Sequence, residues 1–156
     1  MQVFMPFPDH NQTAQYLDDI RLNKQIVEAY QIAEICLIQL GLRQGKTAWK
    51  HHPIVKNVYN NGKPYLPDLY RYITTCDREW IRRGKNRGSE FRSKLLKLGE
   101  DIFNNINLFS WEPMKVYESY DYYKLLLKDK WDSDKIVVKC SIGGNSNVRC
   151  NQMGRR

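Results

Sequence analysis

The chain has 156 residues, of which 42% are hydrophobic and 27% charged, as is typical of one globular domain with a single core. Its 25 lysines and arginines exceed its 17 acidic residues, and the net charge of +8 favours a polyanion partner because neutralised phosphates release counterions. No segment has the roughly 20 consecutive apolar residues of a membrane span, and the apolar first eight residues are too short for a signal peptide. We therefore expect a soluble, cytoplasmic, monomeric protein that does not enter a membrane.

An extended arm and a long helix are expected at the start of the chain. Two prolines within residues 1–8 disfavour a regular helix there. Asp9 is a helix-capping residue, and Gln12 three positions later completes a pattern similar to a capping box. The helix is expected to run to about Leu40, because Gly41 supplies a left-handed stop. A helix of this length is expected to lie centrally and to be buried along much of its course.

One face of this first helix is polar. At about 100° per residue, Asp18, Arg21, Lys24, Gln25 and Glu28 share that face. On an ordinary solvated face these side chains would form only weak pairs of ~0.3–0.5 kcal/mol each. In a desolvated cleft the same cluster supplies acid and base functions, and a cation beside Lys24 favours its neutral, nucleophilic amine. Both interpretations are consistent with the spacing.

The rest of the chain predicts further helices and one strand. A basic loop at 42–52 contains Trp49, Lys50 and His52, and His52 before a proline at a helix start is suited to contact phosphate, although exposed histidines are common in such loops. Helices are expected at about 53–59, 67–84, 89–105 and 116–130, and a strand at 136–141 before a Gly-Gly turn. The fold class is therefore mainly α, with one compact helical domain over residues 1–135 and a C-terminal hairpin or basic tail over 136–156.

The four cysteines do not form a Cys-x-x-Cys motif. Cys36 and Cys76 lie in helical patterns and are expected to behave as small core residues. Cys140 and Cys150 flank the Gly-Gly turn, and this spacing is compatible with a disulfide or with a metal pair. We expect a reducing compartment and neither a cofactor nor a metal ion.

Short motifs follow one another over about residues 1–85 in an order and spacing that chance does not explain. They are Pro6-Phe7-Pro8-Asp9, Leu17-Asp18, Arg21-Leu22, Lys24-Gln25, Glu28, Trp49, His52-Pro53 and Glu79-Trp80-Ile81-Arg82-Arg83-Gly84. In these motifs the chain resembles the pyrimidine-dimer DNA glycosylases, the endonuclease V type of bacteriophage repair enzyme. It is most similar to a poorly characterised branch of that family, and a viral or phage origin would fit.

The resemblance implies a compact helical domain that binds damaged double-stranded DNA. In that family a primary amine attacks the sugar C1′, releases the base through an imine, and can then break the strand by elimination. The amine is the chain's own N-terminus after removal of the initiator methionine, and a glutamate of the first helix assists.

The chain departs from this family pattern at both ends. Gln2 is bulky, so we expect the initiator methionine to be retained and the terminal amine to belong to Met1. Near the other end, the branch carries a His-Arg element before a leucine pair, whereas this chain has Tyr120-Asp121-Tyr122 before Leu125-Leu126.

A third departure concerns the catalytic glutamate. The family places it beside the arginine of the first helix, but Leu22 and Asn23 follow Arg21 here. Glu28 or Asp18 is expected to substitute for it.

The function that we expect is that of a DNA glycosylase, with AP-lyase activity possible, acting on a damaged or modified base. Lys24 or the Met1 amine is expected to be the nucleophile, and Glu28 to stabilise the sugar cation and take up protons. Arg21, oriented by Asp18, is expected to hold the phosphate. Further DNA contacts are expected from Gln25, Trp49, Lys50, His52, Arg82, Arg83, Lys85 and Arg87.

Two other classes of function fit the same pattern. One is a non-catalytic nucleic-acid-binding module of the same fold, and the other is an enzyme that acts on a free nucleotide or nucleoside. The first would bind DNA without covalent chemistry, and the second would have little affinity for duplex DNA.

Overall fold

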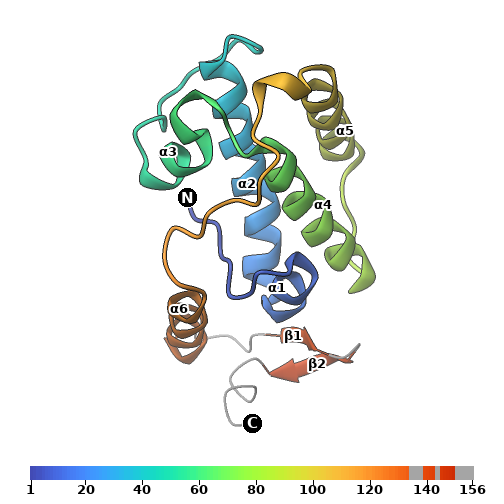
Figure 1. Cartoon of the computed structure of the whole chain (residues 1–156). Helices are drawn as coiled ribbons and strands as arrows, with labels where there is room; N and C mark the ends of the chain where they lie inside the picture. The colour runs from blue at the N-terminus through green and yellow to red at the C-terminus, as the bar shows by residue number, and fades with distance from the viewer. Residues whose placement is uncertain (134–138, 143–144, 150–156) are drawn as a thin grey trace.

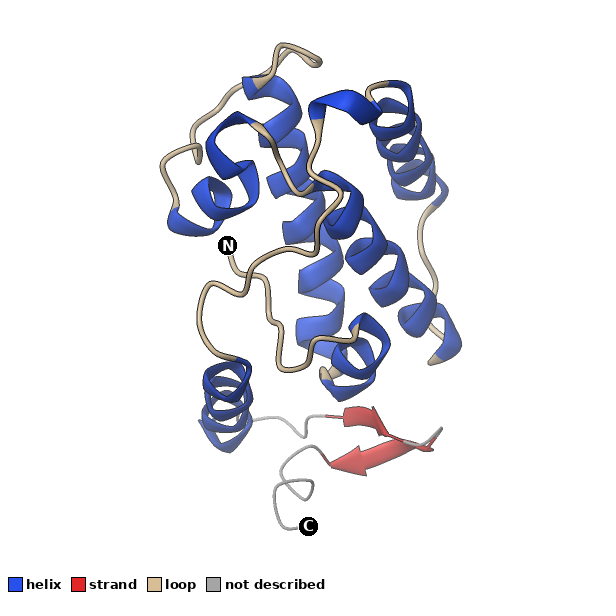
Figure 2. Cartoon of the chain, viewed as in Figure 1, coloured by secondary structure: helices blue, strands red, loops and turns tan. Residues whose placement is uncertain are grey.

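The structure, a computed structural model, describes residues 1–133, 139–142 and 145–149. Most of these residues are helical (Figures 1 and 2), which confirms the mainly α fold class. The elements are α1 (His10–Tyr16), α2 (Asp19–Gln39), α3 (Pro53–Tyr59), the 3-10 turn η1 (Asn60–Gly62), α4 (Leu66–Arg82), α5 (Ser89–Asn104), the 3-10 turn η2 (Ile106–Leu108), α6 (Tyr120–Ser133), β1 (Lys139–Ile142) and β2 (Asn145–Arg149).

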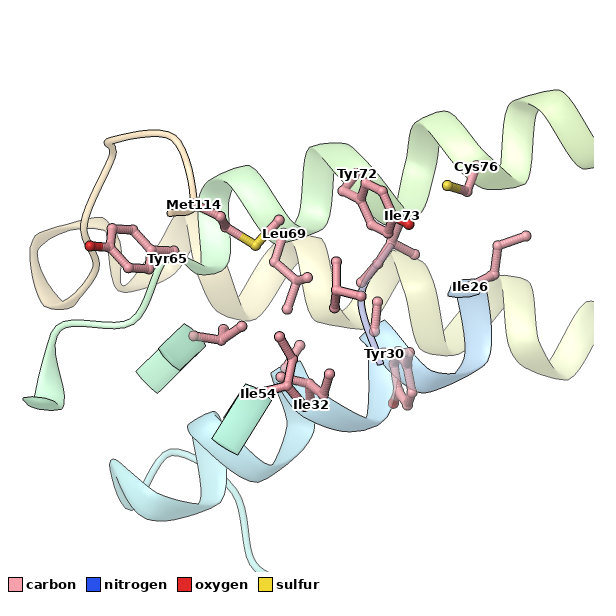
Figure 3. Packing of buried hydrophobic residues seen from close by; sticks show 14 of the residues in the cluster. Ile26, Tyr30, Ile32, Ile54, Tyr65, Leu69, Tyr72, Ile73, Cys76 and Met114 are labelled. Carbon is pink, nitrogen blue, oxygen red and sulfur yellow. The ribbon is translucent and has the colours of Figure 1, made fainter. Parts of the chain in front are cut away.

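Helix α2 lies at the centre and packs chiefly against α4, with α3 against its C-terminal half (Figure 1). Figure 3 shows Ile26 on the side of α2 that is turned toward α4, and Tyr72 and Ile73 between the two helices. Ile26, Tyr72 and Ile73 are fully buried, and each large apolar side chain buried in this way contributes ~1.5–3 kcal/mol. The expected central helix is thus present and carries the core.

The segment predicted as one helix from Asp9 to Leu40 is two helices. Leu17 and Asp18 are extended, with ψ of 139° and 163°, and they separate α1 from α2. Asp18 caps the second helix, because its Oδ1 accepts from the backbone N–H of Arg21 at 2.9 Å. The guanidinium of Arg83 donates to the carbonyls of Ala14 and Leu17 at 3.0 and 2.7 Å, which satisfies the freed end of α1.

The predicted helix stops agree with the structure. Gly41 and Gly84 adopt φ of 75° and 78° directly after α2 and α4, a conformation that glycine adopts without steric cost. The last helix begins at Tyr120, four residues later than expected. None of the described helices is long and apolar enough to cross a membrane.

The C-terminal strand belongs to a hairpin that lies beside α1 (Figure 1). β1 and β2 are antiparallel, with Lys139 opposite Arg149. The expected domain boundary at 135–136 and Cys150 lie outside the described residues, so the division into two parts and the Cys140/Cys150 pairing stay predictions.

Candidate active site

A pocket lies between the N-terminal arm, the first half of α2, and α6. Its lining comprises Met1, Gln2 and Phe4 from the arm, Ile20, Arg21, Lys24 and Glu28 from α2, and Lys130 from α6. Three α2 side chains that the helical spacing placed on one face, together with the residue that carries the terminal amine, therefore line a single pocket. Lys130 was not predicted from the sequence.

The arm is held against α2 by side chains that bind its backbone. The N–H of Gln2 donates to Glu28 Oε2 at 3.2 Å, and the N–H of Phe4 donates to Gln25 Oε1 at 2.8 Å. In return, the carbonyl of Gln2 accepts from Gln25 Nε2 at 2.9 Å. The arm is thus held along α2 by bonds to its backbone, and its first residue, Met1, lines the pocket.

Cations dominate the pocket. Arg21, Lys24 and Lys130 line it together with Met1, which carries the terminal amine, and Glu28 is the one carboxylate among the described residues that line it. Glu28 is half-buried, whereas Lys24 is exposed. A concave site lined mainly by one sign of charge attracts the opposite sign, so this pocket is suited to bind an anion such as phosphate.

Asp18 does not line this pocket, contrary to its expected place on the polar face. Its side chain is fully buried. Its Oδ2 accepts from the indole N–H of Trp131 at 2.7 Å and lies 3.5 Å from Nη1 of Arg21. A carboxylate that caps a helix and binds two further donors is a structural group. The catalytic role expected of Asp18 stays a prediction, and these contacts do not favour it.

Gln25 is also misplaced by the helical pattern. It is fully buried and bonds the arm, and its Oε1 also accepts from the hydroxyl of Tyr72 at 2.7 Å. A fully buried amide does not reach DNA. The direct DNA contact expected of Gln25 stays a prediction, and this burial does not favour it.

The basic segment after α4 is divided between structural and exposed residues. Arg83, with 2% of its side chain exposed, pairs with Glu79 and Asp19 at 2.9 and 2.8 Å. Arg87 pairs with Asp77 at 2.9 Å and bonds Asn23 at 3.0 Å, with 9% of its side chain exposed. Both guanidinium groups are therefore bound within the protein, and the DNA contacts expected of Arg83 and Arg87 stay predictions.

Arg82 and Lys85 lie on the surface, with 42% and 44% of their side chains exposed. Arg82 contacts Glu79 at 2.7 Å, and Lys85 lies 3.6 Å from Asp19. Neither is among the described residues that line the pocket. Of the four residues predicted to contact phosphate, these two have the more exposed side chains.

The loop before α3 presents an exposed aromatic ring. Trp49 is 54% exposed and lies edge-on to His52, with 6.0 Å between ring centroids. His52 caps α3, because its Nδ1 accepts from the N–H of Ile54 at 3.3 Å. Lys50 is exposed beside them. None of the three lines the pocket that holds Met1.

Residues 1–93 match the sequence pattern of the family described as pyrimidine dimer DNA glycosylase. The chain belongs to this family. No curated protein and no solved structure gives a significant match to it. Membership in the pyrimidine dimer DNA glycosylase family suggests DNA glycosylase activity and a DNA substrate.

The family match covers the arm, both halves of the divided first helix, and α3 and α4, but it ends within α5. It therefore includes every predicted site residue. Lys130 and Trp131 of α6 lie beyond it, so part of this glycosylase-family pocket is built by a segment that the family pattern does not describe.

The two described free cysteines take no part in the pocket. Burial raises the pKa of the Cys36 and Cys76 thiols to about 12, so both stay protonated near neutral pH. They are core residues, as predicted, and not nucleophiles.

Proposed function

We propose that this protein excises a damaged or modified base from double-stranded DNA through an amine and imine mechanism at the pocket between the N-terminal arm, α2 and α6. The observation that carries the proposal is the position of Glu28, which accepts from the N–H of the residue next to the terminal amine. A glutamate and the residue that carries a primary amine thereby line one cationic pocket, which brings together the groups that this chemistry requires.

The proposed reaction begins when a neutral amine attacks C1′ of the nucleotide. The C1′–N bond to the base breaks, the base leaves with a proton, and the sugar ring opens to give a C1′=N imine on the protein. Removal of a proton from C2′ then expels the 3′ phosphate and breaks the strand. Glu28 is the group assigned to stabilise the sugar cation and to carry the protons. Water finally hydrolyses the imine and frees the amine.

The Met1 amine is our preferred nucleophile. An α-amino group is ordinarily easier to deprotonate than a lysine side chain, and the contacts of Gln2 and Phe4 fix the arm that carries it. Lys24 lines the same pocket and is the second candidate. Mapping of a trapped adduct distinguishes the two.

Duplex binding is assigned to cations inside and around the pocket. Arg21 and Lys130 are proposed to hold the phosphates that flank the reacting nucleotide, while Arg82 and Lys85 supply contacts that are independent of sequence. Trp49, which is exposed, is proposed to stack where a base has left the duplex. The net charge of +8 supports steep dependence of affinity on salt.

Borohydride trapping tests the proposal. The purified protein is incubated with duplexes that carry a pyrimidine dimer, an abasic site or no lesion, and borohydride reduces any imine to a stable adduct. We expect an adduct on the dimer duplex that maps to Met1, and none on intact DNA. An adduct on the abasic duplex alone would leave a lyase with another base substrate. Tight binding without any adduct would instead indicate a non-catalytic binding module.

A further inference from the structure

We propose that Gln25 and Tyr72 are positioning residues that fix how far the N-terminal amine reaches into the pocket. The inference rests on the proposed function and deepens it. Gln2 is the first residue of the arm whose backbone is bonded to α2. Only Met1 precedes it, so this register of the arm assigns the nucleophilic amine to Met1.

Gln25 binds the arm on both sides of Val3. Its amide group resembles a peptide unit, since it offers one carbonyl oxygen and one N–H pair. It uses them on the N–H of Phe4 at 2.8 Å and the carbonyl of Gln2 at 2.9 Å. Two bonds to residues two apart fix the register, because a slip by one residue would break both and turn the arm's side chains to the opposite face.

Tyr72 completes this arrangement from α4. Its hydroxyl lies 2.7 Å from Gln25 Oε1 and 2.9 Å from the carbonyl of Phe4. The hydroxyl has one proton for these two acceptors, and because Gln25 and Tyr72 are both fully buried, water does not compete for it. We call Gln25 and Tyr72 the arm clamp.

The side chains of the arm reinforce the clamp. Val3, Phe4 and Met5 are 2%, 6% and 5% exposed. Phe4 also contacts the Tyr123 ring of α6 edge-on, with 6.3 Å between ring centroids. With Gln2 to Met5 held, the position of the amine varies only through Met1, and one residue spans at most ~3.6 Å. We therefore expect the amine to reach its reactive position only when one residue precedes Gln2.

A buried glutamine is costly unless it serves such a purpose. Replacing it by an apolar residue would leave the Gln2 carbonyl and the Phe4 N–H without these partners, at about 1–3 kcal/mol for each buried group that stays unsatisfied. A purely structural role would affect stability alone. A positioning role also affects the rate and the site of imine formation, and those are the quantities to measure.

The first test is Gln25→Met, which keeps the side-chain length and removes both bonds to the arm. Gln31→Met is the matched control, because Gln31 is exposed on the same helix. We expect Gln25→Met to reduce the trapping rate at saturating abasic duplex at least tenfold, with DNA affinity changed less than twofold and helical content retained. Tyr72→Phe is expected to reduce the rate less. If the Gln25→Met protein forms the adduct at Met1 at the wild-type rate, the inference is overturned.

The second test leaves the core untouched. One added glycine before Met1 moves the amine by one residue, and we expect at least tenfold slower trapping with unchanged DNA affinity. If this protein traps at its new terminus as fast as wild type, the clamp does not set the reach and the inference is wrong. If the wild-type adduct instead maps to Lys24 and the added glycine has no effect, the assignment of Met1 as nucleophile fails, and the clamp's role in positioning fails with it.

Discussion

The indole N–H of Trp131 donates to Asp18 Oδ2 at 2.7 Å and joins residues 113 positions apart. The bond attaches α6 to the start of α2, at the carboxylate that caps this helix. Its consequence is local: the neighbouring residue, Lys130, lines the same pocket as Met1 and Glu28. A segment beyond the family match therefore contributes a cation to the candidate active site.

Lys130→Gln should weaken binding to lesion-containing duplex several-fold and reduce the slope of log affinity against log salt by about one. The reason is that one phosphate contact is lost while the side-chain stem remains. Fluorescence anisotropy over a salt series measures both quantities. Lys128→Gln is the control, because Lys128 is exposed on the same helix and pairs with Asp132. Equal effects of the two substitutions would argue against a specific role for Lys130.

Glu28→Gln should abolish base release and strand cleavage while DNA affinity stays within about twofold. A glutamine keeps the shape and can still accept from the Gln2 N–H, but it neither carries protons nor stabilises a sugar cation. Single-turnover cleavage on gels measures the rate. Glu34→Gln, a half-exposed position on the same helix, should behave as wild type. Unchanged turnover in Glu28→Gln would remove Glu28 from the mechanism.

Arg83→Ala should lower the free energy of unfolding by about 3 kcal/mol, because Glu79 is buried and removing one partner of a buried pair leaves its charge poorly compensated. The carbonyls at the end of α1 also lose their donor. Arg82→Ala removes an exposed partner of the same Glu79 and should cost ~0–1 kcal/mol. Urea unfolding measures both values. A larger loss in Arg82→Ala would contradict the assignment of Arg83 as the structural arginine.

The sequence pattern predicted the helix ends that depend on interactions between residues close in sequence. Gly41 and Gly84 end helices as expected, because the left-handed conformation depends on the residue itself. The break before α2 was missed because the apolar spacing continues through Leu17. Asp18 is a preferred N-cap residue and is the local signal for this break. The break also depends on Arg83, which is distant in sequence and donates to the Leu17 carbonyl at the end of α1.

The candidate site was predicted only where it depends on the spacing of residues along one helix. Helical spacing placed Arg21, Lys24 and Glu28 on one face, and they line one pocket. Gln25 was misplaced because its partners, Gln2 and Phe4, come from an arm whose path no local pattern gives. Spacing on one helix describes that helix, whereas burial depends on what packs against it.

Acid should destabilise the protein partly through Asp68. Burial acts to raise the pKa of this carboxyl, but hydrogen bonds from His10 and the Met114 N–H, at 2.9 and 2.8 Å, outweigh it and lower the pKa below the ordinary value. The unfolded chain then takes up the proton first as pH falls. The stabilisation is therefore complete above the ordinary carboxyl pKa of about 4 and is lost as pH falls through the folded-state value.

Asp68→Asn should consequently melt below wild type near pH 6, and the difference in Tm should narrow as pH falls below about 4. Thermal melts followed by circular dichroism between pH 6 and pH 3 measure it. Asp121→Asn serves as the control, since the Asp121 carboxyl is 87% exposed beside Lys124 and contributes little at any pH. A difference for Asp68→Asn that stays constant over this range would show that its carboxylate charge does not stabilise the fold. The junction between α4 and the segment at Met114 would then depend on shape and hydrogen bonding alone.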